Sequence, residues 1–241
     1  MTSRTLSGFL TTAGSLIFAL GLFSCAHAPV TEGYSSEDLL ALACAPGKNV
    51  AGVKGTVDMK LASPDASGRF PATVRVNAAD GLKVEVNNLI GGVEAVIEVR
   101  GGQYSVKVPN HPEKSSSGKG SWGGIPLMWA NELFLGRIPC PATSDAGRLN
   151  FEIGSESTVG VRVRPGGAKG VEDYYLYRFK SVKGKPWPQS LRWERTVNGR
   201  TGGVIFAFDD PDDTSGSPLR WEARSGSGEV KVRWKDRETL R

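Results

Sequence analysis

Apolar residues recur at every second position over most of this chain, and this pattern restricts its fold more than any other feature. Side chains of a β-strand point alternately to opposite faces, so such segments form strands with one apolar and one solvated face. Turn signals such as Asp80-Gly81 and Asn198-Gly199 separate them at hairpin spacing. We therefore predict a mainly β fold with a single antiparallel sheet of about 10 to 11 strands. The alternating segments are Val57-Met59-Leu61, Ala72-Val74-Val76, Leu82-Val84-Val86, Val93-Ala95-Ile97-Val99, Tyr104-Val106-Val108, Val161-Val163, Tyr175-Tyr177-Phe179, Leu191-Trp193, Leu219-Trp221-Ala223 and Val230-Val232-Trp234.

Two segments interrupt the alternation and have the pattern of short helices. In residues 35–45, Ser36 is the predicted N-cap of the first helix. Residues 125–135 have Pro126 in the first turn, end at Gly136, and are apolar on nearly every side. Two short helices cannot cover a flat sheet of this size. We therefore predict that the sheet curls around them into a half-open, incomplete barrel, with the helices covering its apolar concave face.

The N-terminal sequence predicts export and lipidation. Residues 1–24 contain Arg4 followed by an apolar stretch, as in a secretory signal peptide. Leu22-Phe23-Ser24-Cys25 resembles the lipobox of bacterial lipoproteins, which implies that Cys25 is lipidated. The alternative is a secreted protein cleaved near Ala26-His27-Ala28. Our domain assignment is a signal peptide at 1–24, a lipidated tether at 25–34 and one half-barrel domain at 35–241.

The two remaining cysteines, Cys44 and Cys140, would lie in an oxidising compartment after export. A disulfide between them is possible, and two buried free thiols are the alternative. The formal net charge of +5 suits a protein working beside an anionic membrane, or it is only a solvated surface. Basic and aromatic residues do not cluster as they do in nucleic-acid binders, so we expect no nucleic-acid partner.

One predicted turn carries unusual side chains. In Val86-Asn87-Asn88-Leu89-Ile90-Gly91-Gly92-Val93, Asn and Gly supply the backbone freedom of a hairpin, yet Leu89 and Ile90 occupy its tip. Such a tip gains free energy when it moves from water into lipid. The alternative is that both side chains pack on the rim of the protein.

The sequence offers little for catalysis. Its histidines are His27, in the predicted tether, and His111, in a predicted loop, so a Ser-His-Asp or Cys-His system lacks its base. The acidic run Asp209-Asp210-Pro211-Asp212-Asp213 lacks the spacing of a calcium loop. We expect no enzymatic activity, no metal and no cofactor.

Two motifs resemble the LolB family of outer-membrane lipoprotein receptors, which is related to the periplasmic carrier LolA. Asn88-Leu89-Ile90-Gly91-Gly92-Val93-Glu94 resembles the family's apolar turn and following strand. Ile125-Pro126-Leu127-Met128-Trp129-Ala130-Asn131-Glu132-Leu133-Phe134-Leu135-Gly136 is similar to its isoleucine-proline-leucine helix. The order of elements along the chain also agrees.

The resemblance implies a monomeric, lipid-anchored receptor on the periplasmic side of the outer membrane. It would accept acylated lipoproteins from a LolA-like carrier and insert them into the inner leaflet of the outer membrane, with Leu89 and Ile90 touching that leaflet. Ala26, rather than an Asp after the lipidated cysteine, also favours the outer membrane. Two alternatives remain: a structural or scaffolding lipoprotein, and a binder or transporter of another lipid or glycolipid.

A receptor of this kind needs an apolar cavity for acyl chains such as palmitate, because each exposed methylene costs about 0.8 kcal/mol in water. The alternative for each candidate residue is that it packs in a filled core and lines no cavity. The candidates for the cavity are Val74, Val76, Val84, Val86, Ile97, Leu127, Trp129, Phe134 and Leu135.

Overall fold

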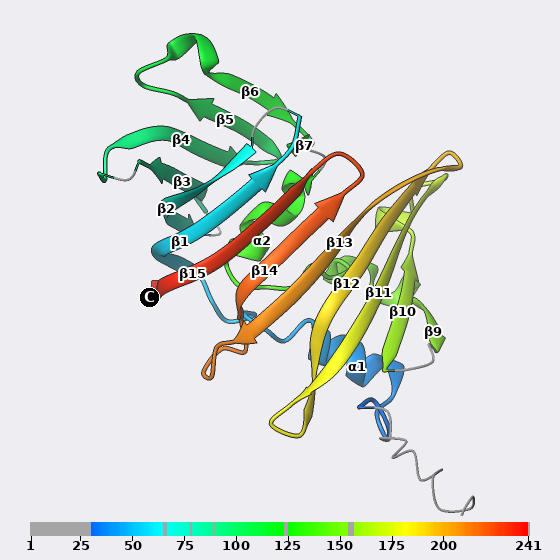
Figure 1. Cartoon of the computed structure of the whole chain (residues 1–241). Coiled ribbons are helices and arrows are strands. Elements are labelled where there is room, and N and C mark those ends of the chain that lie inside the picture. The colour runs from blue at the N-terminus through cyan, green and yellow to red at the C-terminus, as the bar shows by residue number, and fades with distance from the viewer. Residues whose placement is uncertain are drawn as a thin grey trace, which may run out of the picture.

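The computed structural model describes residues 30–64, 67–77, 79–88, 90–122, 125–153 and 157–240. Most of them belong to one 13-stranded antiparallel sheet, in the order β6-β5-β4-β3-β2-β1-β15-β14-β13-β12-β11-β10-β9. The C-terminal strand β15 pairs with β1 and so joins two consecutive meanders, while β6 and β9 form the two edges (Figure 1). The signal peptide, Cys25 and Leu89 lie outside the described residues.

The first meander contains six strands of the sheet, and a short hairpin follows it. The six strands are β1 (Gly52–Ala62), β2 (Ser67–Asn77), β3 (Gly81–Asn87), β4 (Val93–Arg100), β5 (Gln103–Lys107) and β6 (Ser116–Lys119). The hairpin pairs β7 (Ser121–Trp122) with β8 (Ile125–Pro126).

The second meander runs along the other half of the sheet. Its strands are β9 (Asn150–Ile153), β10 (Thr158–Val163), β11 (Val171–Val182), β12 (Lys185–Val197), β13 (Arg200–Pro211), β14 (Pro218–Ser225) and β15 (Glu229–Leu240). Short 3₁₀ turns occur at Pro112–Lys114, Leu127–Trp129, Thr143–Arg148 and Pro165–Gly167.

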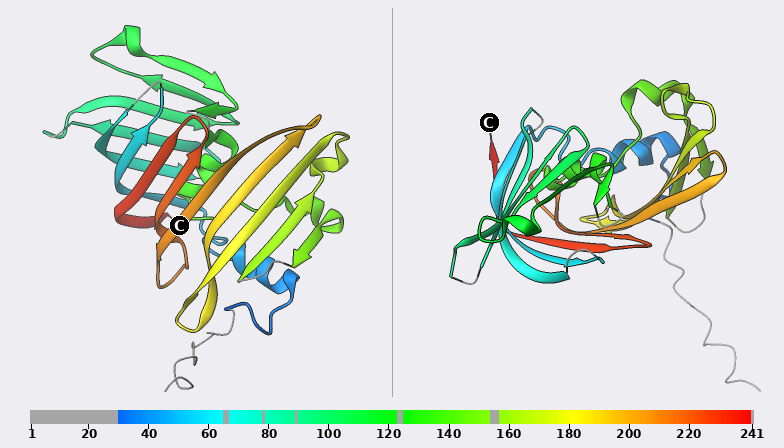
Figure 2. Two further views of the ribbon diagram at one scale, coloured as in Figure 1. Left: turned by 45° about the vertical axis from the view of Figure 1, so that its right-hand side comes forward. Right: turned by 90° about the horizontal axis from the view of Figure 1, so that it is seen from above.

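The sheet curves strongly, and the helices lie on its concave side (Figure 2). Register shifts between Thr56 and Val57, Val86 and Asn87, and Arg178 and Phe179 interrupt the ladders. Such bulges bend a strand and increase its twist. Gly55 precedes the first shift, and a Cβ there would lie 2.4 Å from the carbonyl oxygen of Asp236, so only glycine fits. The prediction of a curved, half-open β structure is confirmed.

Both helices are shorter than predicted. Helix α1 spans Ser36–Ala43, and its N-cap is Ser35 rather than Ser36, because the Ser35 hydroxyl and the Asp38 side chain form a capping box. Helix α2 spans only Ala130–Phe134. Ile125 pairs with Trp122 in the β7–β8 hairpin instead of starting a helix, in keeping with the extended backbone favoured before a proline.

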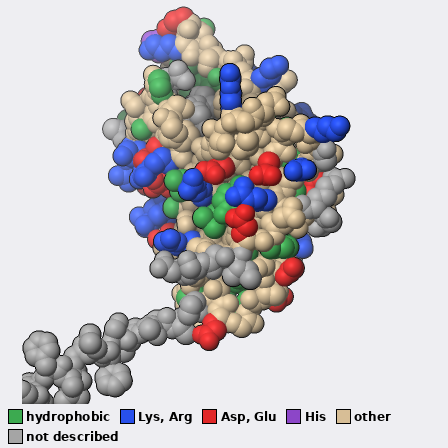
Figure 3. Space-filling model, turned by 90° about the vertical axis from the view of Figure 1, so that its right-hand side faces the viewer, with side chains coloured by type: hydrophobic (Ala, Val, Ile, Leu, Met, Phe, Trp, Pro, Cys, Tyr) green, Lys and Arg blue, Asp and Glu red, His purple; other side chains and the backbone are tan. Residues whose placement is uncertain are grey.

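The hydrophobic core joins the concave face of the sheet to both helices. The predicted alternation reappears as alternating burial, for example at Val57, Met59 and Leu61 of β1. On the face shown in Figure 3, acidic and basic side chains are interspersed. Within the described residues, no helix has the length and apolar character needed to cross a membrane.

Candidate functional site

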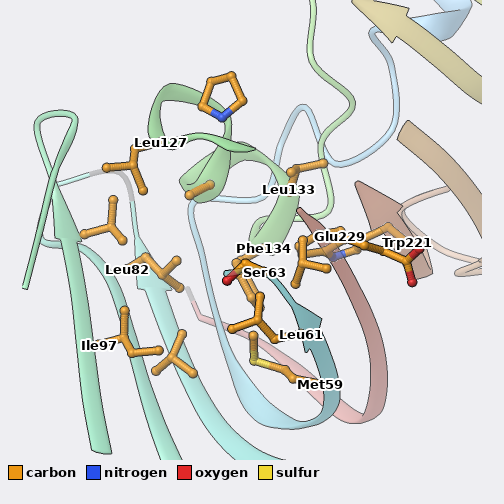
Figure 4. Close-up of a pocket in the computed structure, with 15 residues that line it drawn as sticks. Met59, Leu61, Ser63, Leu82, Ile97, Leu127, Leu133, Phe134, Trp221 and Glu229 are labelled. Carbon is orange, nitrogen blue, oxygen red and sulfur yellow. The ribbon is translucent and has the colours of Figure 1, made fainter. Parts of the chain in front are cut away.

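Helix α2 and the 3₁₀ turn before it lie across the concave face and cover a small cavity. The cavity has a volume of about 60 Å³. Figure 4 shows side chains from the helical segment above and from the strands below converging on it. Its strand side is formed chiefly by Met59, Leu61, Leu82, Val84, Ile97 and Val230, and its helix side by Leu127, Ala130, Leu133 and Phe134. The polar side-chain groups among the lining residues are those of Ser63 and Glu229 and the indole N–H of Trp221, and the rest are apolar, so the cavity is suited to hydrocarbon.

The register of the sheet places these side chains together. Leu82 is paired with Val99 and Val84 with Ile97 across β3 and β4. Leu61 is paired with Val230 across β1 and β15. Since side chains on one face of neighbouring strands contact each other, the pairs make a continuous apolar floor under α2.

Aromatic contacts fix α2 and the turn before it to strands of the second meander. The ring of Phe134 meets that of Trp221 edge to face, with centroids 5.2 Å apart. Near the start of the helix, Trp129 meets Trp193 in the same way at 6.0 Å. Edge-to-face pairs of this kind contribute about 0.5 to 1.5 kcal/mol beyond their buried area. The helical segment is therefore anchored to β14 at its end and to β12 at its start.

Polar contacts hold the C-terminal end of α2 and the segment after it. Arg237 donates to the carbonyl of Leu135 at 2.9 Å. Arg137 donates to the carbonyls of Gly47 at 3.1 Å and Val50 at 2.7 Å. Burial lowers the pKa of the Arg237 guanidinium, while the negative charge of Asp212 acts in the opposite direction. Gly136 follows the helix with φ +75°, the conformation typical of a glycine at this position.

A disulfide adds a covalent tie between the two helical segments. Cys44, the C-cap of α1, is bonded to Cys140, and their Cα atoms lie 6.0 Å apart. The Tyr177 hydroxyl donates to the neighbouring carbonyl of Pro139 at 2.8 Å. Full burial raises the pKa of that hydroxyl well above its ordinary value, so Tyr177 remains a neutral donor.

The turn between β3 and β4 projects from the body of the protein (Figure 2). Ile90 in this turn is 93% exposed. The Asn88 side-chain oxygen accepts hydrogen bonds from the backbone N–H groups of Ile90 at 3.1 Å and Gly92 at 2.7 Å. Gly91 has φ +87°, which a side chain would strain. The turn therefore presents Ile90 to solvent on a hydrogen-bonded backbone.

The predicted cavity residues divide into three groups. Val84, Ile97, Leu127 and Phe134 line the cavity under α2. Val74, Val76, Val86 and Leu135 are buried but do not border it, because their positions along the sheet or helix direct them into the core elsewhere. Trp129 borders a different pocket, on the other face of α2.

Sequence reasoning missed several lining residues. Met59, Leu61, Leu82, Val99, Trp221 and Val230 all lie in alternating segments, and Leu133 lies in the predicted helix. The alternation pattern correctly indicates that these residues face inward. It does not indicate where α2 crosses the sheet, and that position decides which inward-facing residues border the cavity.

A strongly curved single sheet with short helices in its hollow and an apolar cavity beneath one of them defines a half-open β-barrel fold. No protein-family model and no curated protein matches the sequence. The structure is similar to that of a LolA superfamily protein from Nitrosomonas europaea, with TM-score 0.52 and 12% identity, covering 86% of this chain and 94% of that one. It is also similar to a DUF1329 family protein from Desulfovibrio piger, with TM-score 0.50 and 8% identity, covering 85% and 91%. The chain thus has the LolA superfamily fold, which confirms the family resemblance at the level of fold.

Proposed function

We propose that this protein binds the acyl chains of lipoproteins or lipids in the cavity under α2, and that it is an outer-membrane lipoprotein receptor. The observation that carries the proposal is an almost wholly apolar cavity covered by one short helix. Apolar side chains bind hydrocarbon by hydrophobic transfer and dispersion, without a polar group that would resist release. Catalysis has no part in the proposal.

Acyl-chain binding requires the cavity to open. Its volume of about 60 Å³ is far below the roughly 300 to 1,000 Å³ of typical small-molecule sites. Helix α2 is the element to move, since it has only five residues and its ends are held mainly by side chains. A chain entering between Leu133 and Leu61 would take over the apolar contacts that α2 makes with the strands.

In this proposal, the β3–β4 turn contacts the membrane when cargo is delivered. Ile90 is almost fully exposed, and fully transferring such a side chain to lipid contributes about 1.5 to 3 kcal/mol. Leu89 lies beside it in the sequence and would add to this contact. Lipidation at Cys25 would hold the receptor at the outer membrane, facing the periplasm, where a LolA-like carrier supplies the cargo.

The experiment uses a soluble form that starts after Cys25, mixed with a periplasmic carrier loaded with a labelled lipoprotein. We expect cargo to pass to this protein and then to liposomes. Ile90→Glu should still accept cargo but fail to deliver it. The matched control is Ile205→Glu, because Ile205 is also an exposed isoleucine, 54% exposed, on β13.

A folded protein that takes no cargo from the carrier would contradict the receptor function. If it then binds free lipid, the remaining function is that of a binder of another lipid or glycolipid. If it binds neither, a structural lipoprotein with a filled core remains.

A further inference from the structure

A second and larger pocket lies on the opposite face of α2. Its volume is about 650 Å³, within the usual range of small-molecule sites. The 3₁₀ turn and α2 contribute Met128, Trp129 and Glu132, and the strands contribute Val163, Tyr175 and Arg195. The Cys44–Cys140 disulfide and Ala142 form another part of the wall.

The two spaces lie back to back across one helix. Leu127, Ala130 and Leu133 face the cavity, at the three-residue spacing of a helical face. Trp129 and Glu132 repeat that spacing on the face toward the pocket. The neighbours Leu127 and Met128 border different spaces, and Met128 is 45% exposed. The start of the helical segment therefore separates the two spaces, and a ligand would reach both there when α2 moves.

The charged groups of the pocket are largely paired with each other. Arg195 binds Asp173 through two hydrogen bonds of 2.6 and 2.7 Å, and Asp173 is 1% exposed. Arg137 binds Glu132 at 3.2 Å. A ligand with a net charge would have to break such pairs, and leaving one member buried and unpaired is costly.

Other polar groups of the pocket suit an uncharged ligand group. The indole Nε1 of Trp129 is buried, and among the described residues it has no hydrogen-bond partner. A buried donor without a partner costs about 1 to 3 kcal/mol. Because this nitrogen is buried, a ligand hydroxyl or carbonyl oxygen would reach it, and recover that cost, only when Trp129 moves together with α2. Lys48 is at the exposed rim, where water solvates its charge.

We propose that this pocket binds the uncharged polar end of an acyl amphiphile, with hydroxyl, ester or amide groups, while its chain enters the cavity across α2. This inference rests on the proposed acyl-chain binding and names the other end of the ligand. It gives the protein a two-part site. The cavity takes hydrocarbon of any origin, and the pocket selects for the group that carries it.

The test compares two ligands and two filling variants of the soluble protein. The ligands are the apolar dye N-phenylnaphthylamine, followed by its fluorescence, and radiolabelled monopalmitoylglycerol, which has an uncharged hydroxyl head. Ala142→Trp fills the pocket from an exposed position, and Ala130→Phe fills the cavity. Thermal unfolding verifies that both variants are folded.

We expect Ala142→Trp to weaken monopalmitoylglycerol binding about tenfold, the effect of one or two lost hydrogen bonds, and to leave dye binding unchanged. An equal effect on both ligands, or on neither, would overturn the proposal. Lys48→Ala should change neither affinity, and weaker binding of monopalmitoylglycerol would refute an uncharged head group. If Ala130→Phe leaves the dye bound, the cavity assignment and the proposed function are wrong. In that case, weaker binding of monopalmitoylglycerol alone by Ala142→Trp would still support the pocket as the site of the polar end.

Discussion

A guanidinium nitrogen of Arg237, on β15, donates a 2.9 Å hydrogen bond to the backbone carbonyl of Leu135 directly after α2. This bond satisfies one of the carbonyl groups that every helix leaves free at its C-terminal end. It also joins the helix over the cavity to the strand that connects the two halves of the sheet. Opening of the cavity by movement of α2 would therefore break it.

Replacement of Arg237 by leucine should loosen α2. The variant loses the bond to Leu135 but also the cost of burying a guanidinium, so we expect a destabilisation of about 1 to 2 kcal/mol in urea unfolding. Stopped-flow fluorescence should show faster entry of an apolar dye. Arg233→Leu, an exposed position on the same strand, is the control and should change neither value. Unchanged entry in Arg237→Leu would contradict the role of α2 as the moving cover.

Enlarging the cavity should improve binding at a cost in stability. Leu133 and Leu135 are each 1% exposed, but only Leu133 borders the cavity. We expect Leu133→Ala and Leu135→Ala each to lose about 2 to 5 kcal/mol of unfolding free energy. Only Leu133→Ala should bind a fatty-acyl probe more tightly at a temperature where both are folded. Equal probe binding by the two variants would place the binding site elsewhere.

The turn that presents Ile90 should depend on Asn88. The side-chain oxygen of Asn88 accepts two backbone hydrogen bonds within the turn, and alanine removes both. Since the turn is exposed, we expect a small loss of stability, about 0.5 to 1.5 kcal/mol, together with weaker delivery of cargo to liposomes. Asn110→Ala, in another exposed turn, should leave delivery intact. Full delivery by Asn88→Ala would mean that the turn needs no fixed shape.

The general fold followed from alternation, and the exceptions have identifiable causes. Strand β6 has the sequence Ser116-Ser117-Gly118-Lys119, which contains no apolar alternation. An edge strand needs none, and a side chain at Gly118 would lie 2.6 Å from the ring of Tyr104. Strand β13 does alternate at Val204, Phe206 and Phe208, but glycines precede this pattern and weaken its strand signal, so it is absent from our predicted strands.

The site was less predictable than the sheet. Alternation identifies Val76 and Val84 equally well as inward-facing residues, yet only Val84 borders the cavity. Their difference depends on where α2 crosses the sheet, which Arg237, Phe134 and Trp221 decide through contacts between residues far apart in the chain. Sequence periodicity reports which face a side chain occupies and carries no information about such contacts.

The Cys44–Cys140 disulfide should contribute substantially to stability. It closes a loop with a sequence separation of 96 residues. The chain-entropy model gives about 4 to 5 kcal/mol for a loop of this length. We expect urea unfolding with and without a reducing agent to differ by about this amount. A Cys44→Ser, Cys140→Ser double variant should match the reduced protein. A difference below about 1 kcal/mol would show that α1 stays docked without the bond.

Two buried tyrosines should make the protein sensitive to alkali. Burial raises the pKa of both Tyr175 and Tyr177 above the ordinary value, so the folded state disfavours their ionisation. The unfolded chain releases these protons at about pH 10, so stability is full below that pH and falls as the pH rises above it. Absorbance of tyrosinate should show exposed tyrosines ionising reversibly, and these two ionising only together with loss of the folded circular dichroism signal. Ionisation of every tyrosine in the folded protein would contradict the burial of Tyr177 against Pro139.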